Sequence, residues 1–165
     1  MRELLEGRRI GFALRPPIAS VAVGLGIAVT LLDLTAWFGW GSRDTNGLVV
    51  GAYWLSIATA VVGIVGTTTA LAELSDVPEE DRTLARLDVA GIAVATVLYV
   101  ATAAIRSFDL GAAGASPPAL LLAVAALVVL GAGSTMSSLL YAAREWEEIE
   151  EVTHERHHRR RTAVR

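Results

Sequence analysis

The sequence predicts an all-α membrane protein: a four-transmembrane-helix bundle, N-in/C-in, with a cytoplasmic amphipathic C-terminal helical tail. Two observations predict this class. Hydrophobic residues make up 53% of the chain, and its mean hydropathy is +0.51. Charged residues, 19% of the total, collect in short segments between long uncharged runs. A soluble domain distributes charge along every element, because each helix or strand needs a wet face.

Four apolar runs are long enough to cross a bilayer, which takes about 20 helical residues. They cover about residues 17–40, 47–74, 85–106 and 119–141. We therefore expect three parts: a cytoplasmic N-terminal segment (1–16), a transmembrane domain (17–141) and a charged cytoplasmic tail (142–165).

Prolines and polar residues mark where these helices are expected to begin. Pro16 and Pro17 open the first run, and a second proline pair opens the fourth, where proline fits a first helical turn. In the connector before the third run, Ser75 or Asp76 is expected to cap a helix whose first turn holds Pro78.

The arginines predict the orientation. The N-terminal segment holds four, the connector before the third run two and the tail six, whereas the other two connectors hold one each, Arg43 and Arg106. Cytoplasmic segments of membrane proteins carry the excess of basic residues. Both termini are therefore expected in the cytoplasm, in the cytoplasmic membrane of a bacterium. Trp37, Trp40 and Trp54 fall near the expected outer surface, where tryptophans are enriched.

Small residues indicate close helix packing. Gly47 and Gly51 form a G-x-x-x-G pattern, and the fourth run contains a segment of small and hydroxyl residues, Gly131–Ser138. Such residues let helix backbones approach one another. Ordinary contacts within the bundle are the simplest interpretation, and a dimer interface or a binding cavity are the alternatives.

Asp33 is the main candidate for a functional residue. It lies seven residues before Trp40, so about 10 Å below the expected outer surface at about 1.5 Å per residue. Its helix face carries small residues, which favours a position facing the bundle. An acid within a membrane is costly, so it needs a named partner. The candidate polar cluster is Asp33, Thr30, Tyr99 and Arg106, with Arg106 as the expected ionic partner.

Three interpretations of Asp33 remain open at this point. It can be a structural acid that fixes the packing of the first and third runs, a group that handles protons or cations, or part of a lipid- or quinone-facing surface. Its position near the membrane surface, rather than at the midplane, favours the structural interpretation.

The C-terminal tail has apolar residues at helical spacing, which predicts an amphipathic helix along the membrane surface. His154, His157 and His158 are weak candidates for a metal site, because no carboxylate or cysteine completes a specific motif. Arg159, Arg160 and Arg161 are expected to meet anionic lipid headgroups, at about 1 kcal/mol for each residue.

The residue inventory excludes several classes of chemistry. The chain has no cysteine, which excludes disulfides and thiolate metal sites. No histidine lies in any apolar run, so a haem held by two histidines is not available. No phosphate-binding glycine loop or nucleophile elbow is present. We therefore expect no enzyme activity, no cofactor, no metal site and no nucleic-acid partner.

The pattern over Arg15–Tyr141 resembles the domain of unknown function 2231 family, small four-span bacterial membrane proteins. Asp33 falls on the family's aspartate near the end of span one, and Arg106 on the arginine that ends span three. The resemblance places Arg15 and Asp88 where the family has histidines, and Met136–Ser138 where it has Gly-Gly-Glu. If those histidines bind a cofactor or carry protons, this chain lacks them. Arg15 and Asp88 are candidates for an ion pair at the cytoplasmic interface.

These observations predict a small non-enzymatic subunit or scaffold of a membrane assembly. Its expected partners are the lipid bilayer and other membrane proteins, or a second copy of the chain. The alternative is a small proton- or ion-coupled carrier that uses Asp33. A haem or quinone redox subunit is disfavoured by the missing histidines.

Overall fold

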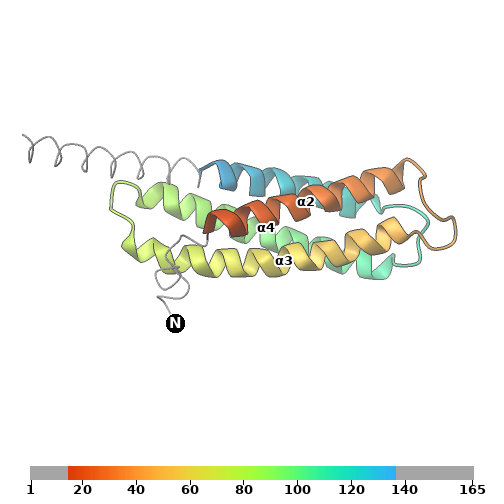
Figure 1. Ribbon diagram of the computed structural model, residues 1–165, viewed down its shortest axis with the longest axis horizontal. Helices are drawn as coiled ribbons and strands as arrows, with labels where there is room; N and C mark the ends of the chain where they lie inside the picture. Colours follow the sequence, from red (N-terminus) through yellow and green to blue (C-terminus); the bar gives the residue numbers. More distant parts are fainter. Residues whose placement is uncertain (1–14, 137–165) are drawn as a thin grey trace, which may run out of the picture.

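The computed structural model describes residues 15–136. This part is a bundle of long helices joined by short connectors (Figure 1). The helices are α2 (Arg15–Trp37), α3 (Gly47–Glu73), α4 (Arg82–Phe108) and a fourth helix described over Pro117–Met136, with a short 3-10 helix, η1 (Leu74–Asp76), after α3. No strand occurs within residues 15–136.

All four long helices are long and apolar enough to cross a membrane. Their most apolar windows have mean hydropathies of 1.9 to 2.2. The chain is therefore a multi-pass membrane protein, with an all-helical fold over the described residues. The spans differ from the expected ranges by a few residues at most of their ends.

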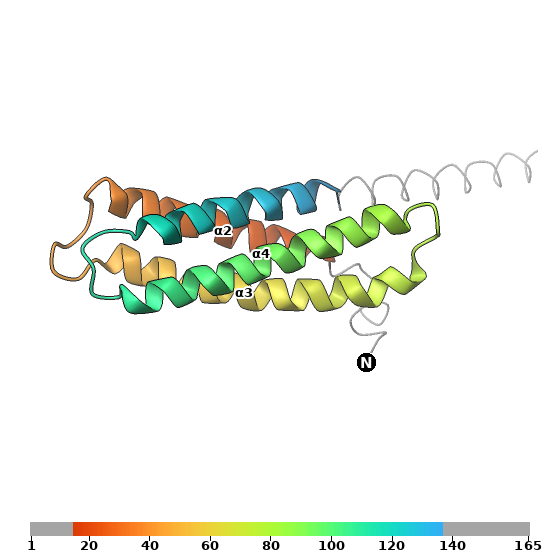
Figure 2. The ribbon, with the colours of Figure 1, turned by 180° about the vertical axis from the view of Figure 1, so that it is seen from behind.

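Connectors 38–46 and 109–116 lie together at one end of the bundle, called here the Trp40 end, and connector 74–81 lies at the other, the Pro78 end (Figures 1 and 2). Consequently, α2 and α4 both run from the Pro78 end to the Trp40 end. The helix α3 and the fourth helix run the opposite way.

Helix α2 ends at Trp37, three residues before the expected end of the first span. Gly39, with φ of 83°, adopts the left-handed conformation that a glycine reaches without strain. The N–H of Gly39 bonds to the Ala36 carbonyl (3.1 Å), and the N–H of Trp40 bonds to the Thr35 carbonyl (3.1 Å). This pair of bonds is a Schellman motif, which satisfies the last carbonyls of the helix and stops it.

The expected cap at Ser75 or Asp76 is wrong. Both residues belong to η1, which extends α3, and Val77 is extended with φ of −78° and ψ of 130°. A residue that precedes proline is restricted to this region, so the helix cannot run through Val77 into Pro78. A turn from Pro78 to Asp81 follows (Asp81 N to Pro78 O, 3.2 Å), and α4 begins at Arg82.

Small side chains fill the interior, and large apolar ones point outward. The main buried cluster comprises Ala22, Val29, Ala60, Ala95, Tyr99, Ala123, Ala126 and Leu130. Exposed residues on the spans include Val21, Leu31, Ile64, Val97, Leu121 and Val128. This arrangement suits a bilayer, where lipid contacts large apolar side chains and small residues allow helices to approach. A side chain added at Gly51, Gly63 or Gly66 would meet Leu32, Thr96 or Ile18 respectively, so these glycines stand where the bundle leaves little room.

Candidate functional site

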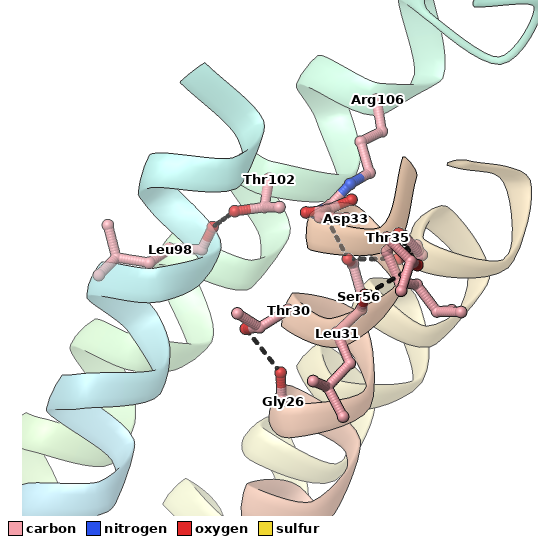
Figure 3. Close-up of polar contacts among 11 residues, drawn as sticks. Gly26, Thr30, Leu31, Asp33, Thr35, Ser56, Leu98, Thr102 and Arg106 are labelled. Atoms are coloured by element: carbon pink, nitrogen blue, oxygen red, sulfur yellow. Dashed lines mark hydrogen bonds and ion pairs between the residues drawn. The ribbon is translucent and has the colours of Figure 1, made fainter. Parts of the chain in front are cut away.

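An ion pair between Asp33 and Arg106 lies inside the bundle near the Trp40 end. Nη2 of Arg106 donates a hydrogen bond to Oδ2 of Asp33, and both residues are only 1% exposed. Figure 3 shows the guanidinium of α4 pointing toward the carboxylate of α2. The sequence named these two residues as candidates, and the structure brings them together.

Ser56 of α3 is the third member of this site. Nη1 of Arg106 donates to the Ser56 hydroxyl, which donates in turn to the Ala52 carbonyl (2.6 Å). The site therefore joins α2, α3 and α4. The sequence reasoning missed Ser56, although a signal was present, because Ser56 falls at helical spacing among Val49, Ala52, Ala60 and Gly63, the buried small-residue face of α3.

Local helix position favours this placement of charge. Arg106 lies in the last turn of α4, where the helix dipole is negative and a cation is favoured. Asp33 lies one turn before Trp37, the last residue of α2. Because α2 and α4 run in the same direction, the two opposite charges reach the same level of the bundle.

The geometry of the pair favours a structural role. Burial of two ions costs free energy that only a close counter-charge and additional hydrogen bonds offset. Arg106 has both a carboxylate and a hydroxyl as acceptors, whereas Oδ1 of Asp33 accepts no hydrogen bond from any residue that the structure describes. Removal of either charge would leave the other buried and uncompensated.

Thr30 and Tyr99 do not join this site. The hydroxyl of Thr30 donates to the Gly26 carbonyl of its own helix (3.0 Å), an alternative always open to threonine in a helix. Tyr99 lies seven residues before Arg106, and its hydroxyl packs directly against Gly26 of α2. Within residues 15–136 this buried hydroxyl has no hydrogen-bond partner. Of the four candidates, Asp33 and Arg106 therefore form a charge pair, which Ser56 completes. Thr30 bonds within its own helix, and Tyr99 makes a separate contact with Gly26.

Asp88 lies toward the Pro78 end of α4 and is 0% exposed. It lines a small cavity between all four long helices, together with Ile18, Ala19, Ala22, Val62, Gly63, Gly66, Ile92, Leu130 and Ser134. The cavity has room for about one water molecule. The expected partner of Asp88, Arg15, is the first residue of α2, and the Arg15 side chain lies outside the described part.

Asn46 is a second polar residue that the sequence reasoning missed. It is 1% exposed and caps α3 by accepting a hydrogen bond from the Leu48 N–H (3.0 Å). Its amide group donates to the carbonyls of Trp40 and Ala113, both at 2.8 Å. Asn46 thus joins the two connectors of the Trp40 end. The position just before an apolar run was the available signal for the cap.

The remaining candidates concern the tail. His154, His157 and His158, and the headgroup candidates Arg159, Arg160 and Arg161, lie outside the described residues. Over residues 15–136, no group of three or more His, Cys, Asp or Glu side chains is placed to hold a metal ion.

Comparisons with known proteins add no relative. No family model matches the chain, and neither a curated protein nor a solved structure is similar to it. The resemblance to the domain of unknown function 2231 family therefore stays a prediction, and the functional argument rests on the site itself.

Proposed function

We propose that this chain is a non-enzymatic small subunit or scaffold of a membrane assembly in the bacterial cytoplasmic membrane. The observation that carries the proposal is the Asp33–Arg106–Ser56 site, in which the acid within the first span is neutralised inside the bundle. An ion pair that joins three helices is suited to fixing their packing. A carrier instead lines a midplane site with several polar groups, often on broken helices, whereas α2, α3 and α4 are continuous.

The proposed orientation has both termini in the cytoplasm and the Trp40 end outside. It rests on the arginine distribution, since the segments expected inside hold twelve of the 14 basic residues. The aromatic side chains support it: Trp37, Phe38, Trp40, Trp54 and Phe108 are all more than half exposed, and all lie toward the Trp40 end. Aromatic belts of this kind stand at membrane–water interfaces.

The proposed partners are the lipid bilayer and either other membrane proteins or a second copy of the chain. Lipid contacts account for the outward-facing apolar side chains, since each span window is at most 39% buried inside the bundle. The basic tail, with Arg159–Arg161, would add headgroup contacts on the cytoplasmic side.

Affinity purification of the tagged chain from its native membrane tests the proposal. A stoichiometric membrane partner, or a homo-oligomer, is the expected result, and the Asp33→Asn variant should reduce the amount of folded chain recovered. Recovery of the wild-type chain alone, as a monomer, would count against a subunit role.

A carrier that uses Asp33 is the second candidate. The observation that favours it is the buried Oδ1 of Asp33, which accepts no hydrogen bond from the described residues and is free to hold a proton or cation. Proton and cation flux into proteoliposomes distinguishes the two. A flux that Asp33→Asn abolishes without loss of folding would replace the subunit proposal with the carrier.

A further inference from the structure

Helices α2 and α4 face each other across the bundle. Each packs along α3, whereas their own backbones do not come close to one another. Contacts between α2 and α4 therefore require side chains that reach across the bundle axis. Two polar side chains of α4 make such contacts within residues 15–136: Arg106 to Asp33, and the Tyr99 hydroxyl to Gly26.

Both contacts have the same register. The two residues of each pair are 73 positions apart in the chain. The pairs are also seven residues apart on each helix, which is one heptad of a left-handed bundle. In each pair a long side chain of α4 meets a short one of α2, as the separation across the axis requires. Residue n of α2 is thus level with residue n+73 of α4.

The same register makes Arg15 level with Asp88. Arg15 precedes Asp33 by 18 residues, and Asp88 precedes Arg106 by the same number. Eighteen residues are about five helical turns at 3.6 residues per turn, so the two positions fall on the same face of each helix. The cavity wall agrees with this register, because Asp88 shares it with Ile18 and Ala19, one turn after Arg15.

Burial gives Asp88 a need for a counter-charge. Its side chain is fully buried at the Pro78 end of the spans. An ionised carboxylate is costly to bury unless it is paired and hydrogen-bonded. Among the basic residues within 15–136 near this end, Arg86 is exposed on the opposite face of α4 and Arg82 lies 3.9 Å from Glu79. Arg15 is the one that the register sets level with Asp88.

We propose that Arg15 is the counter-charge of Asp88, so that α2 and α4 are joined by two charge pairs of opposite polarity at the two ends of the spans. At the Trp40 end the acid is on α2 and the base on α4; at the Pro78 end the base is on α2 and the acid on α4. The pairs are about 27 Å apart at 1.5 Å per residue, close to the thickness of the hydrocarbon core. A shift of α2 along α4 would break both pairs at once, so together they fix the register of the bundle. This inference does not depend on the proposed function.

Charge reversal tests the proposal. Arg15→Asp and Asp88→Arg should each lower the Tm of the detergent-solubilised protein and its amount in the membrane. The combined Arg15→Asp/Asp88→Arg variant should restore about half of the loss or more, because it re-forms the pair with reversed polarity. Arg86→Gln removes an exposed arginine two residues before Asp88 and is the matched control, with no change expected. The proposal is overturned if the Tm of the combined variant is no higher than that of the less stable single variant.

Cross-linking supplies a measurement that does not depend on stability, and the cysteine-free chain makes it clean. A short bifunctional thiol reagent, applied to native membranes, should link Arg15→Cys to Asp88→Cys. Ala22→Cys with Ala95→Cys, which have the same register and are both buried, is the positive control. Val21→Cys with Val94→Cys, also level but 52% and 50% exposed, should not react within one chain. Linkage of the positive control without linkage of 15 to 88 overturns the proposal.

Discussion

Asp33→Asn, Arg106→Gln and their combination form the most direct test of the buried charge pair. Each single substitution removes one charge; Asp33→Asn keeps the shape of the side chain, and Arg106→Gln keeps a polar but shorter one. Asp33→Asn leaves the Arg106 cation with Ser56 and a neutral amide, at a position that is 1% exposed. Arg106→Gln leaves the carboxylate of Asp33 without its ionic partner, and Oδ1 already lacks a donor among the described residues.

The expected magnitude follows from these contacts. Loss of one partner of a buried ion pair costs about 3 to 5 kcal/mol, because the remaining charge is uncompensated. The double variant contains two neutral amides and leaves no uncompensated charge, so it should lose less than either single variant. The coupling free energy should then reach about 3 kcal/mol, the upper end of measured pairwise values.

Reversible unfolding in mixed detergent micelles, followed by helical circular dichroism, measures the four free energies of unfolding. Ser107→Ala is a suitable control, since Ser107 is exposed and its hydroxyl bonds only its own helix at the Ala104 carbonyl (2.7 Å). Losses for the two single variants that simply add in the double variant would refute the reasoning, because independent sites do not form a pair.

Four further substitutions test the packing and the topology. Gly26→Ala should cost about 1 to 3 kcal/mol of unfolding free energy, because its new Cβ would overlap the Tyr99 hydroxyl, whereas Gly24→Ala, with nothing within 4 Å of its Cβ, should cost nothing in the same assay. Tyr99→Phe removes a buried hydroxyl that has no partner within residues 15–136, so it should be neutral alone and should restore Gly26→Ala; no restoration would contradict that contact. Asn46→Asp keeps the cap acceptor but loses both bonds to loop carbonyls, and a loss of about 1 to 3 kcal/mol is expected. A cysteine introduced at Arg43 should react with an impermeant thiol reagent added outside intact cells, and protection there would reverse the proposed orientation.

The sequence predicts the helices well because a bilayer imposes a simple requirement. About 20 apolar residues are needed for each span, and the uncharged runs meet it without reference to any tertiary contact. The start of the third helix was harder to predict. Pro78 has the fixed φ of a first helical turn, but its restriction on Val77 decided the local conformation, and α4 begins four residues later.

The charge pair illustrates what sequence spacing can and cannot supply. Helical periodicity placed Asp33 on a small-residue face, and Arg106 was the nearest base at the same end of a parallel span. Periodicity indicates that Ser56 lies on the buried face of α3, but it could not show that Arg106 would reach the Ser56 hydroxyl, since that contact joins two helices. It also could not separate Tyr99 from the pair, because the register that places Tyr99 against Gly26, seven residues before Asp33, depends on how α2 and α4 are aligned.

The sequence by itself determined the class of the protein: the membrane spans, the termini of several helices and the presence of costly charges within apolar runs. These features depend on local composition and on the solvent, so they can be derived from the chain one segment at a time. Only the tertiary structure decided which polar groups meet. The register of 73 residues between α2 and α4 brings Asp33 to Arg106, gives Tyr99 its contact at Gly26 and sets Asp88 level with Arg15. That register is a property of the packed bundle, because it arises from small residues on four helices that lie far apart in the sequence.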